Sequence, residues 1–274
     1  MPHEEQSLLK RARTDVVAAR TFVEGHGAAA FGLARHLLHD DAAAEDATQE
    51  ALMRAFAAAD TFDPSRGTLR TWLLAIVRHA AFEMLRERRR APAALEPTGD
   101  DAEPLLELGV AAGWGADPEK EVARAEQREL LARALASLSP TDREVVVLRD
   151  LEGLSLDEVA RVIGLELGAA KSRLHRARLR LVAALRSIEE GVVAEEHDVG
   201  GMRCRDVLAV LSEYVDGDLG PTDRARVESH LRGCAVCERF GGRFAGVVHD
   251  VRERLGAKTV VDPRVLEALM ARLR

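Results

Sequence analysis

The sequence predicts an all-α fold, and three features of its composition support this prediction. Helix-forming alanine, leucine, arginine and glutamate dominate the 274 residues. Aromatic residues make up only 4% of the chain, and no stretch alternates apolar and polar residues long enough to indicate a sheet. With 47% hydrophobic residues, a chain of this length can form two or three compact units, each with a core of its own.

Two segments interrupt the helical periodicity and divide the chain into units. Residues 91–117 combine proline, glycine and acidic residues, and residues 189–202 combine glycine with acidic residues. We interpret both as linkers, and the first as a flexible one. The expected units are a helical unit at 1–90, a second helical unit at 118–188, a small third unit at 203–240 and an amphipathic helical tail at 241–274.

Charge and cysteine usage narrow the class of function and the compartment. The net charge of −7 argues against a protein that coats nucleic acid, so any DNA contact must come from local basic patches such as 86–90 and 171–180. No signal peptide and no apolar run of membrane-spanning length are recognisable. The three cysteines cluster in the last quarter of the chain, which is typical of metal or thiol chemistry in a reducing cytosol. We therefore expect a cytoplasmic protein.

The second unit contains the pattern of a helix-turn-helix. Pro140 follows the Ser139 cap at the first position of a helix, whose apolar spacing continues until Gly153. Ser155 and Glu158 form a capping box for a short helix, which Gly164 ends. A basic helix follows after a short turn, so the order is a short helix, a glycine-containing turn and a basic helix.

The basic helix supplies candidate DNA contacts. In a helix-turn-helix the second helix enters the major groove, where arginine and lysine bind guanine edges or phosphates. The candidates in its first turns are Lys171, Ser172, Arg173, His175 and Arg176. The pattern alone also fits a helical hairpin whose basic face is solvated, or binds RNA or an acidic protein.

Four residues of the third unit have the types and spacing of a zinc site. His230, Cys234 and Cys237 follow one another closely, and Cys204 lies upstream. Zinc favours four such ligands in tetrahedral geometry, so we expect one Zn²⁺ ion with a structural or redox-sensing role. Four protein ligands leave no position for water and no zincin motif is present, so we do not expect an enzyme. Buried unliganded cysteines or a redox pair are the alternative.

Three runs of residues carry a resemblance to known families. In the second unit the run is Leu138-Ser139-Pro140, Arg143-Glu144-Val145-Val146-Val147-Leu148-Arg149, Glu152-Gly153-Leu154-Ser155, Glu158-Val159-Ala160, Gly164 and Lys171-Ser172-Arg173-Leu174-His175-Arg176-Ala177-Arg178. It resembles domain four of extracytoplasmic-function sigma factors, and the resemblance implies reading of the minus-35 promoter element. Ala169 and Ala170 stand where that family commonly has threonine and valine, which removes a hydroxyl near the phosphates.

The first unit resembles sigma domain two. The matching runs are Asp46-Ala47-Thr48-Gln49-Glu50-Ala51, Ala55-Phe56, Phe62-Asp63, Arg66-Gly67-Thr68-Leu69-Arg70-Thr71-Trp72-Leu73-Leu74-Ala75-Ile76-Val77-Arg78 and Leu85-Arg86. The resemblance implies that Asp46, Gln49 and Glu50 bind the clamp helices of RNA polymerase. It also implies that basic residues here bind the minus-10 element, and the candidates are Arg66, Arg70, Arg78 and Arg86. Trp72 lies on the apolar stripe of its helix and is expected in the core.

The third unit resembles the zinc-finger module of anti-sigma factors, over Cys204-Arg205-Asp206-Val207, Leu211–Leu219 and His230–Cys237.

Together the three resemblances imply a sigma factor that directs core RNA polymerase to promoter DNA and is regulated in cis by an intramolecular sigma/anti-sigma contact. The alternative is a polymerase-independent helix-turn-helix regulator with a structural zinc module. The sequence leaves open the promoter, the signal, a separate anti-sigma factor, the oligomeric state, and whether the zinc module inhibits, activates or stabilises. It also leaves open where the apolar stripe of the tail packs.

Overall fold

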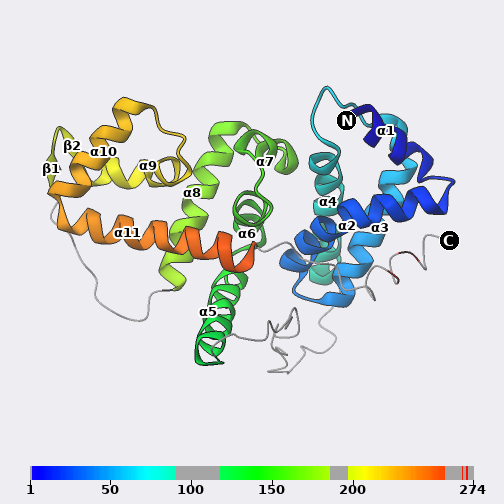
Figure 1. The fold of residues 1–274 in the computed structure, drawn as a ribbon, viewed down its shortest axis with the longest axis horizontal. Helices are drawn as coiled ribbons and strands as arrows, with labels where there is room; N and C mark the ends of the chain where they lie inside the picture. The colour runs from blue at the N-terminus through cyan, green and yellow to red at the C-terminus, as the bar shows by residue number, and fades with distance from the viewer. Residues whose placement is uncertain (1, 91–117, 186–196, 257–266, 268–269, 271–274) are drawn as a thin grey trace.

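The computed structural model describes residues 2–90, 118–185, 197–256, 267 and 270. Helices form almost all of the regular structure of these residues, which confirms the predicted all-α class. Figure 1 shows three groups of helices that follow one another along the long axis of the molecule. The linker predicted at 91–117 lies outside the described residues, and so do the first residues of the one predicted at 189–202.

Within the described residues, each of the first two groups comprises five helical segments, and the third comprises a β-hairpin and four helical segments. The first contains α1 (Pro2–Arg11), α2 (Val16–Leu38), α3 (Asp41–Ala57), the short 3-10 helix η1 (Ala59–Thr61) and α4 (Leu69–Arg90). The second contains α5 (Pro118–Ala136), α6 (Pro140–Val146), the π-helix η2 (Val147–Leu151), α7 (Leu156–Ile163) and α8 (Leu167–Ala184). The third contains the hairpin strands β1 (Asp198–Val199) and β2 (Met202–Arg203), then α9 (Cys204–Asp216), α10 (Pro221–Gly233), α11 (Ala235–Asp250) and the π-helix η3 (Val251–Leu255).

The helix ends follow the capping signals of the sequence. Ser139 caps α6 by accepting a hydrogen bond from the backbone amide of Asp142, and Pro140 stands at the first helical position. The capping box of Ser155 and Glu158 is present, and Gly164 adopts the left-handed conformation, with φ of 69°, that ends α7. These local hydrogen bonds satisfy free amides of the first turn, so they define helix boundaries without tertiary help.

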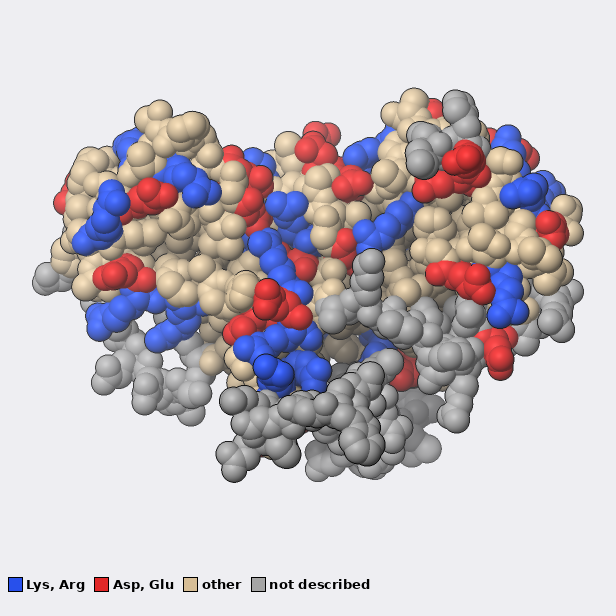
Figure 2. Space-filling view, viewed as in Figure 1, with Lys and Arg blue, Asp and Glu red and all other residues tan. Residues whose placement is uncertain are grey.

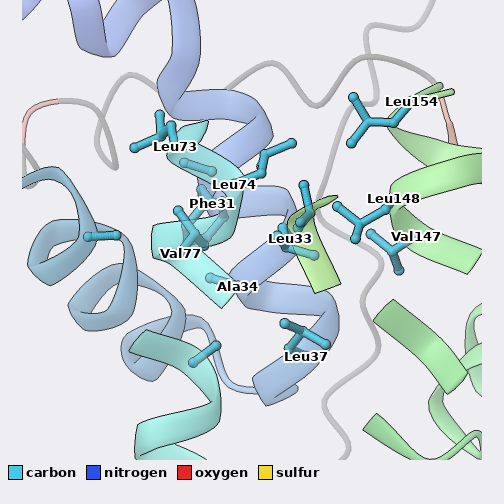
Figure 3. Packing of buried hydrophobic residues seen from close by; sticks show 14 of the residues in the cluster. Phe31, Leu33, Ala34, Leu37, Leu73, Leu74, Val77, Val147, Leu148 and Leu154 are labelled. Carbon is cyan, nitrogen blue, oxygen red and sulfur yellow. The ribbon is translucent and has the colours of Figure 1, made fainter. Parts of the chain in front are cut away.

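The first and second groups share one continuous hydrophobic core. It runs from Phe22 and Leu33 in α2 through Leu73 in α4 to Val147 and Leu148 in η2. Figure 3 shows the η2 side chains lying opposite those of α2 and α4. The expected helix from α6 onward does not stay regular, because η2 widens to a π-helix. Four consecutive residues across the α6–η2 junction, 145–148, are fully buried, since α6 packs against both α2 and α8.

The third group has a small core of its own and is joined to the second group by α8 and α11. Its core contains Val207, Leu211, Val227 and Phe244, together with Val182 from α8. Val251 of η3 lies in the large core instead. The apolar stripe at 247–255 therefore packs on both the third group and the large core, whereas most of the rest of the predicted tail lies outside the described residues.

Two features of the third group differ from the expected boundaries. The second half of the predicted 189–202 linker forms the β1–β2 hairpin, because Gly200 and Gly201 adopt positive φ values of 64° and 75°, which a tight hairpin turn requires. The expected boundary at residue 240 falls inside α11, which runs unbroken to Asp250. Met270, near the C-terminal end, packs against the large core.

Candidate DNA interface and metal centre

The four predicted metal ligands meet in one buried cluster. Cys204 opens α9, His230 lies in the last turn of α10, and Cys234 and Cys237 lie at the start of α11. Their ligand atoms all lie within 4.8 Å of one another. The Sγ atoms of Cys204 and Cys234 are 3.8 Å apart. Two thiolates bound at ~2.3 Å to one tetrahedral zinc ion would be about 3.8 Å apart, so the spacing fits.

The β-hairpin orients His230 for metal binding. Its Nδ1 donates a hydrogen bond to the carbonyl oxygen of Met202 at 2.9 Å, which leaves the lone pair on Nε2. That Nε2 atom is buried and has no hydrogen-bond partner within the described residues. A histidine that donates from one ring nitrogen to a carbonyl and presents the other is the usual arrangement at metal sites. The buried, otherwise unsatisfied nitrogen therefore fits a metal ligand.

The hairpin approaches the cluster closely at Gly233. A Cβ atom at this position would lie 2.5 Å from Cγ1 of Val199 in β1. Gly233 is the last residue of α10, and its φ is not positive, so the backbone conformation itself does not require glycine here. Glycine stands here because only it allows the strand to pack against the helix end.

The electrostatics of the thiols favour a bound cation. Burial opposes ionisation of Cys234, but hydrogen bonds from the Cys237 backbone and from Cys204 outweigh it and lower the pKa of the Cys234 thiol to about 7. Burial and the neighbouring thiols raise the pKa of Cys237 to about 12. One thiolate therefore forms readily, and a cation is needed to ionise the second.

The predicted DNA-contacting residues of α8 divide into two sets. Ser172 and Arg176 are exposed. Lys171, Arg173 and His175 are half-buried because acidic and polar side chains from other elements cover them. The Nζ atom of Lys171 lies 2.9 Å from Oε1 of Glu213, and the Nδ1 atom of His175 lies 3.1 Å from Oγ of Ser212.

The predicted DNA-contacting arginines of the first unit also divide into two sets. Arg66 and Arg86 are exposed. Arg70 donates to the carbonyl oxygen of Glu152 at 2.9 Å and pairs with the carboxylate of the same residue. The Nε atom of Arg78 lies 2.5 Å from a carboxylate oxygen of Glu144. Arg70 and Arg78 therefore both pair with the second unit, although the Arg70 side chain remains 39% exposed.

Glu144 joins cations from both units, and sequence reasoning gave it no role. Its side chain is completely buried, pairs with Arg78 of α4, and lies 3.6 Å from Arg173 of α8. Burial raises the pKa of the Glu144 carboxyl, although Arg78 opposes this shift. The one signal in the sequence was its place next to a run of four apolar residues, where an acid needs a buried partner.

The sequence analysis also did not predict a second cluster of buried charged side chains. Arg178 of α8 pairs with Asp150 of η2 and Asp216 of α9, and all three side chains are only 1% exposed. Arg252 of η3 pairs with the same two carboxylates, at 2.8 Å and 2.5 Å. The cluster joins the second unit, the metal-ligand unit and η3.

The predicted polymerase-binding residues lie together on α3. Asp46, Gln49 and Glu50 line a pocket of about 470 Å³ between α3 and α4, which Met53 and Glu83 also line. Asp46 is exposed and Glu50 half-buried, whereas Gln49 is only 8% exposed. The lining combines carboxylates with two methionines and with Arg54, which pairs with Glu50 and Glu83.

The face of the molecule in Figure 2 carries basic and acidic side chains side by side rather than one basic patch. Among the described residues, no helix is long and apolar enough to cross a lipid bilayer.

The fold and site thus define an all-helical protein with a helix-turn-helix unit and a Cys₃His cluster.

Comparison with known proteins assigns the family. Residues 22–91 match the family "Sigma-70 region 2", residues 128–181 match "Sigma-70, region 4", and residues 204–237 match "Putative zinc-finger". The ECF RNA polymerase sigma factor SigE of Mycolicibacterium smegmatis is 34% identical over 161 residues, which is 58% of each chain. The RNA polymerase sigma factor CnrH of Cupriavidus metallidurans is 34% identical over 60% of this chain and 84% of its own length.

A solved structure of CnrH in complex with the cytosolic domain of CnrY aligns with a TM-score of 0.45 and 27% identity, over 66% of this chain and 96% of that one. On the sequence matches, this chain belongs to the RNA polymerase sigma factors, in the ECF group, and carries a zinc-finger unit of the type matched at 204–237. This confirms the resemblances that the sequence indicated for all three units.

Proposed function

We propose that this chain directs core RNA polymerase to promoter DNA through contacts from α4 and α8, and that the fold described here is its closed form, which excludes promoter DNA. One observation supports the proposal that this fold is a closed form. Arg78 and Arg173, which we assign to the minus-10 and minus-35 elements, are held together by the single buried carboxylate of Glu144. A cation that is paired inside the fold is not available to a phosphate or a base edge.

Distance along DNA supports the same interpretation. Elements at minus 35 and minus 10 are centred roughly 25 base pairs apart, which is about 85 Å along B-DNA. Side chains that share one carboxylate cannot contact both elements, so the two units must separate to read a promoter. The chain between them, residues 91–117, could reach about 90 Å when fully extended. Its length therefore suffices for an open form.

Two other sites of the molecule indicate how it binds core polymerase and a metal ion. The α3–α4 pocket, with Asp46, Gln49 and Glu50, is the proposed contact for a basic helix of core polymerase. The Cys₃His cluster is the proposed site for one Zn²⁺ ion, held by Cys204, His230, Cys234 and Cys237. The ion would link the ends of α9, α10 and α11, and it has no catalytic role because the protein supplies all four ligands.

Run-off transcription with core polymerase tests the proposal. We expect the full chain to initiate weakly and residues 1–190 to initiate several-fold more strongly, because the second form lacks α9, which contacts Lys171 and Arg178 of α8. Both forms keep Glu144, so a Glu144→Gln variant of residues 1–190 should initiate more strongly still if the carboxylate shared by Arg78 and Arg173 holds the closed form. Association with core polymerase should be stable, unlike that of a helix-turn-helix regulator that binds duplex DNA alone. Equal activity of the two forms would argue against inhibition in cis, and no initiation by either form would contradict the sigma function.

Arg176→Ala tests DNA contact from α8. Arg176 is exposed in the closed form, so its replacement should weaken duplex binding to a similar extent across sequences. It should also lower the slope of log affinity against log salt by about 1, because one phosphate contact is lost. Arg133→Ala on α5 removes an equivalent exposed charge, whose one ion pair among the described residues is with Glu129 of the same helix, and it should leave the slope unchanged. An unchanged slope for Arg176→Ala would place the DNA contact elsewhere.

A further inference from the structure

The last turn of α9 carries acidic residues where a helix disfavours them. Glu213 and Asp216 lie in this turn, Asp218 follows the terminal Gly217, and the turn contains no basic residue. The C-terminal end of a helix already bears partial negative charge, so carboxylates there destabilise the helix on its own. Their position in this chain therefore requires cations from a neighbouring element.

Helix α8 supplies those cations along one face. Lys171 and Arg178 are two turns apart and His175 lies between them, so the three side chains point the same way. Lys171 contacts Glu213, His175 contacts Ser212, and Arg178 contacts Asp216 through two hydrogen bonds of 2.9 and 3.1 Å. The hydrogen bond that Lys171 donates to Glu213 raises the pKa of the Lys171 ammonium, so the lysine stays charged in this contact.

Asp216 anchors the contact in a buried site. Its side chain is 1% exposed and pairs with Arg178, Arg252 and Arg149. Asp150 shares two of these guanidinium groups. Buried charges persist only when each is paired, so removal of α9 would leave cations of the second unit without half of their partners. The cluster therefore holds α9 against α8 wherever no other anion replaces it.

We propose that the acidic end of α9 is an internal substitute for DNA phosphates, which occupies Lys171 and His175 through Glu213 and Ser212 and is displaced when duplex DNA binds α8. The proposal rests on the proposed function, because it takes α8 as the DNA-reading helix. Glu213 provides the competing charge at the half-exposed edge, and Asp216 provides the buried anchor. DNA and α9 then bind the same side chains in turn and never together.

Binding of a short duplex oligonucleotide to the full chain, measured by fluorescence anisotropy without polymerase, tests the competition. Glu213→Gln should tighten binding about fivefold or more, the size of a typical coupling between two sites. The matched control is Glu228→Gln on α10, which makes the same charge change in an acid that, within the part of the chain that the structure describes, pairs with Arg224 of its own helix alone. This variant should change affinity much less. Asp216→Asn should also tighten binding. Zinc content reports whether that variant keeps its third unit folded, and if it does not, Glu213→Gln alone decides.

Hydrogen exchange of the unaltered full chain gives an independent readout. Addition of the duplex should raise amide exchange in α9, residues 204–216, if DNA displaces it. Duplex binding with unchanged α9 protection, or equal affinities of the Glu213→Gln and Glu228→Gln proteins, would overturn the competition and leave the sigma function intact. Failure of every variant to bind duplex would overturn the assignment of α8 as a DNA-reading helix, and the competition with it.

Discussion

Removal of the metal is expected to unfold residues 197–250 and to leave the first two units helical. The third unit has a small core, in which Val207, Leu211, Val227 and Phe244 are the main buried side chains. Cores of this size rarely support a fold without a metal or disulfide. A structural zinc ion contributes about 10–16 kcal/mol of apparent binding free energy, which becomes folding free energy when the apo site is unfolded. The ion is therefore expected to be the largest single stabilising contribution in this unit.

Cys237→Ser and chelation should give the same result by circular dichroism and hydrogen exchange. Zinc content should fall from one ion per chain, and amide protection should disappear from α9 to α11 while α2 to α4 stay protected. Arg232→Ala is the matched control, because Arg232 is exposed and lies between His230 and Cys234 in the chain. Retention of α9–α11 protection in metal-free protein would show that the cysteines and histidine form a metal-independent core.

Arg143→Met is expected to destabilise the protein by about 3–5 kcal/mol, because it breaks a buried hydrogen-bond network. Arg143 is 4% exposed and donates to backbone carbonyls of two helix ends. At the end of α5 it reaches Leu135, Ala136 and Leu138 at 2.5–3.1 Å. At the end of α2 it reaches His36 and Leu37 at 3.1 and 3.3 Å. Methionine fills similar volume but cannot donate a hydrogen bond to any of these carbonyls.

The same substitution should loosen the contact between the first two units. The guanidinium group binds the negative ends of two helix dipoles, and α2 and α5 belong to different units. Burial lowers the pKa of Arg143 to about 10, which leaves it charged at neutral pH. Urea denaturation measures the stability loss, with Arg176→Met as the exposed control. A loss below about 1 kcal/mol would mean that water or relaxed carbonyls replace the guanidinium.

Local signals in the sequence predicted most of the elements. The serine and glutamate of the α7 capping box, the glycine that ends this helix and the proline that opens α6 all act within one turn, so they need no tertiary partner. The metal ligands were also recognisable, because three of the four lie within eight residues. The hairpin at 198–203 was missed because its signal is two adjacent glycines between very short strands.

The pairing of the charged side chains depended on the tertiary structure. An exposed arginine that binds DNA and a buried arginine that binds a carboxylate have the same sequence signature. Arg78 and Glu144 are 66 residues apart, and Arg178 and Asp216 are 38 residues apart, so no local pattern connects them. The basic run of α8 looked free of acids, yet acids from α6, η2 and α9 neutralise most of it.

The sequence by itself determined the helical class, the family and the residues able to bind metal, because these depend on residue types, short spacings and capping within single turns. The tertiary structure alone decided that the first two units share a core and that the α9 carboxylates cover the face of α8. The physical reason is that burial and ion pairing are properties of groups brought together from distant parts of the chain.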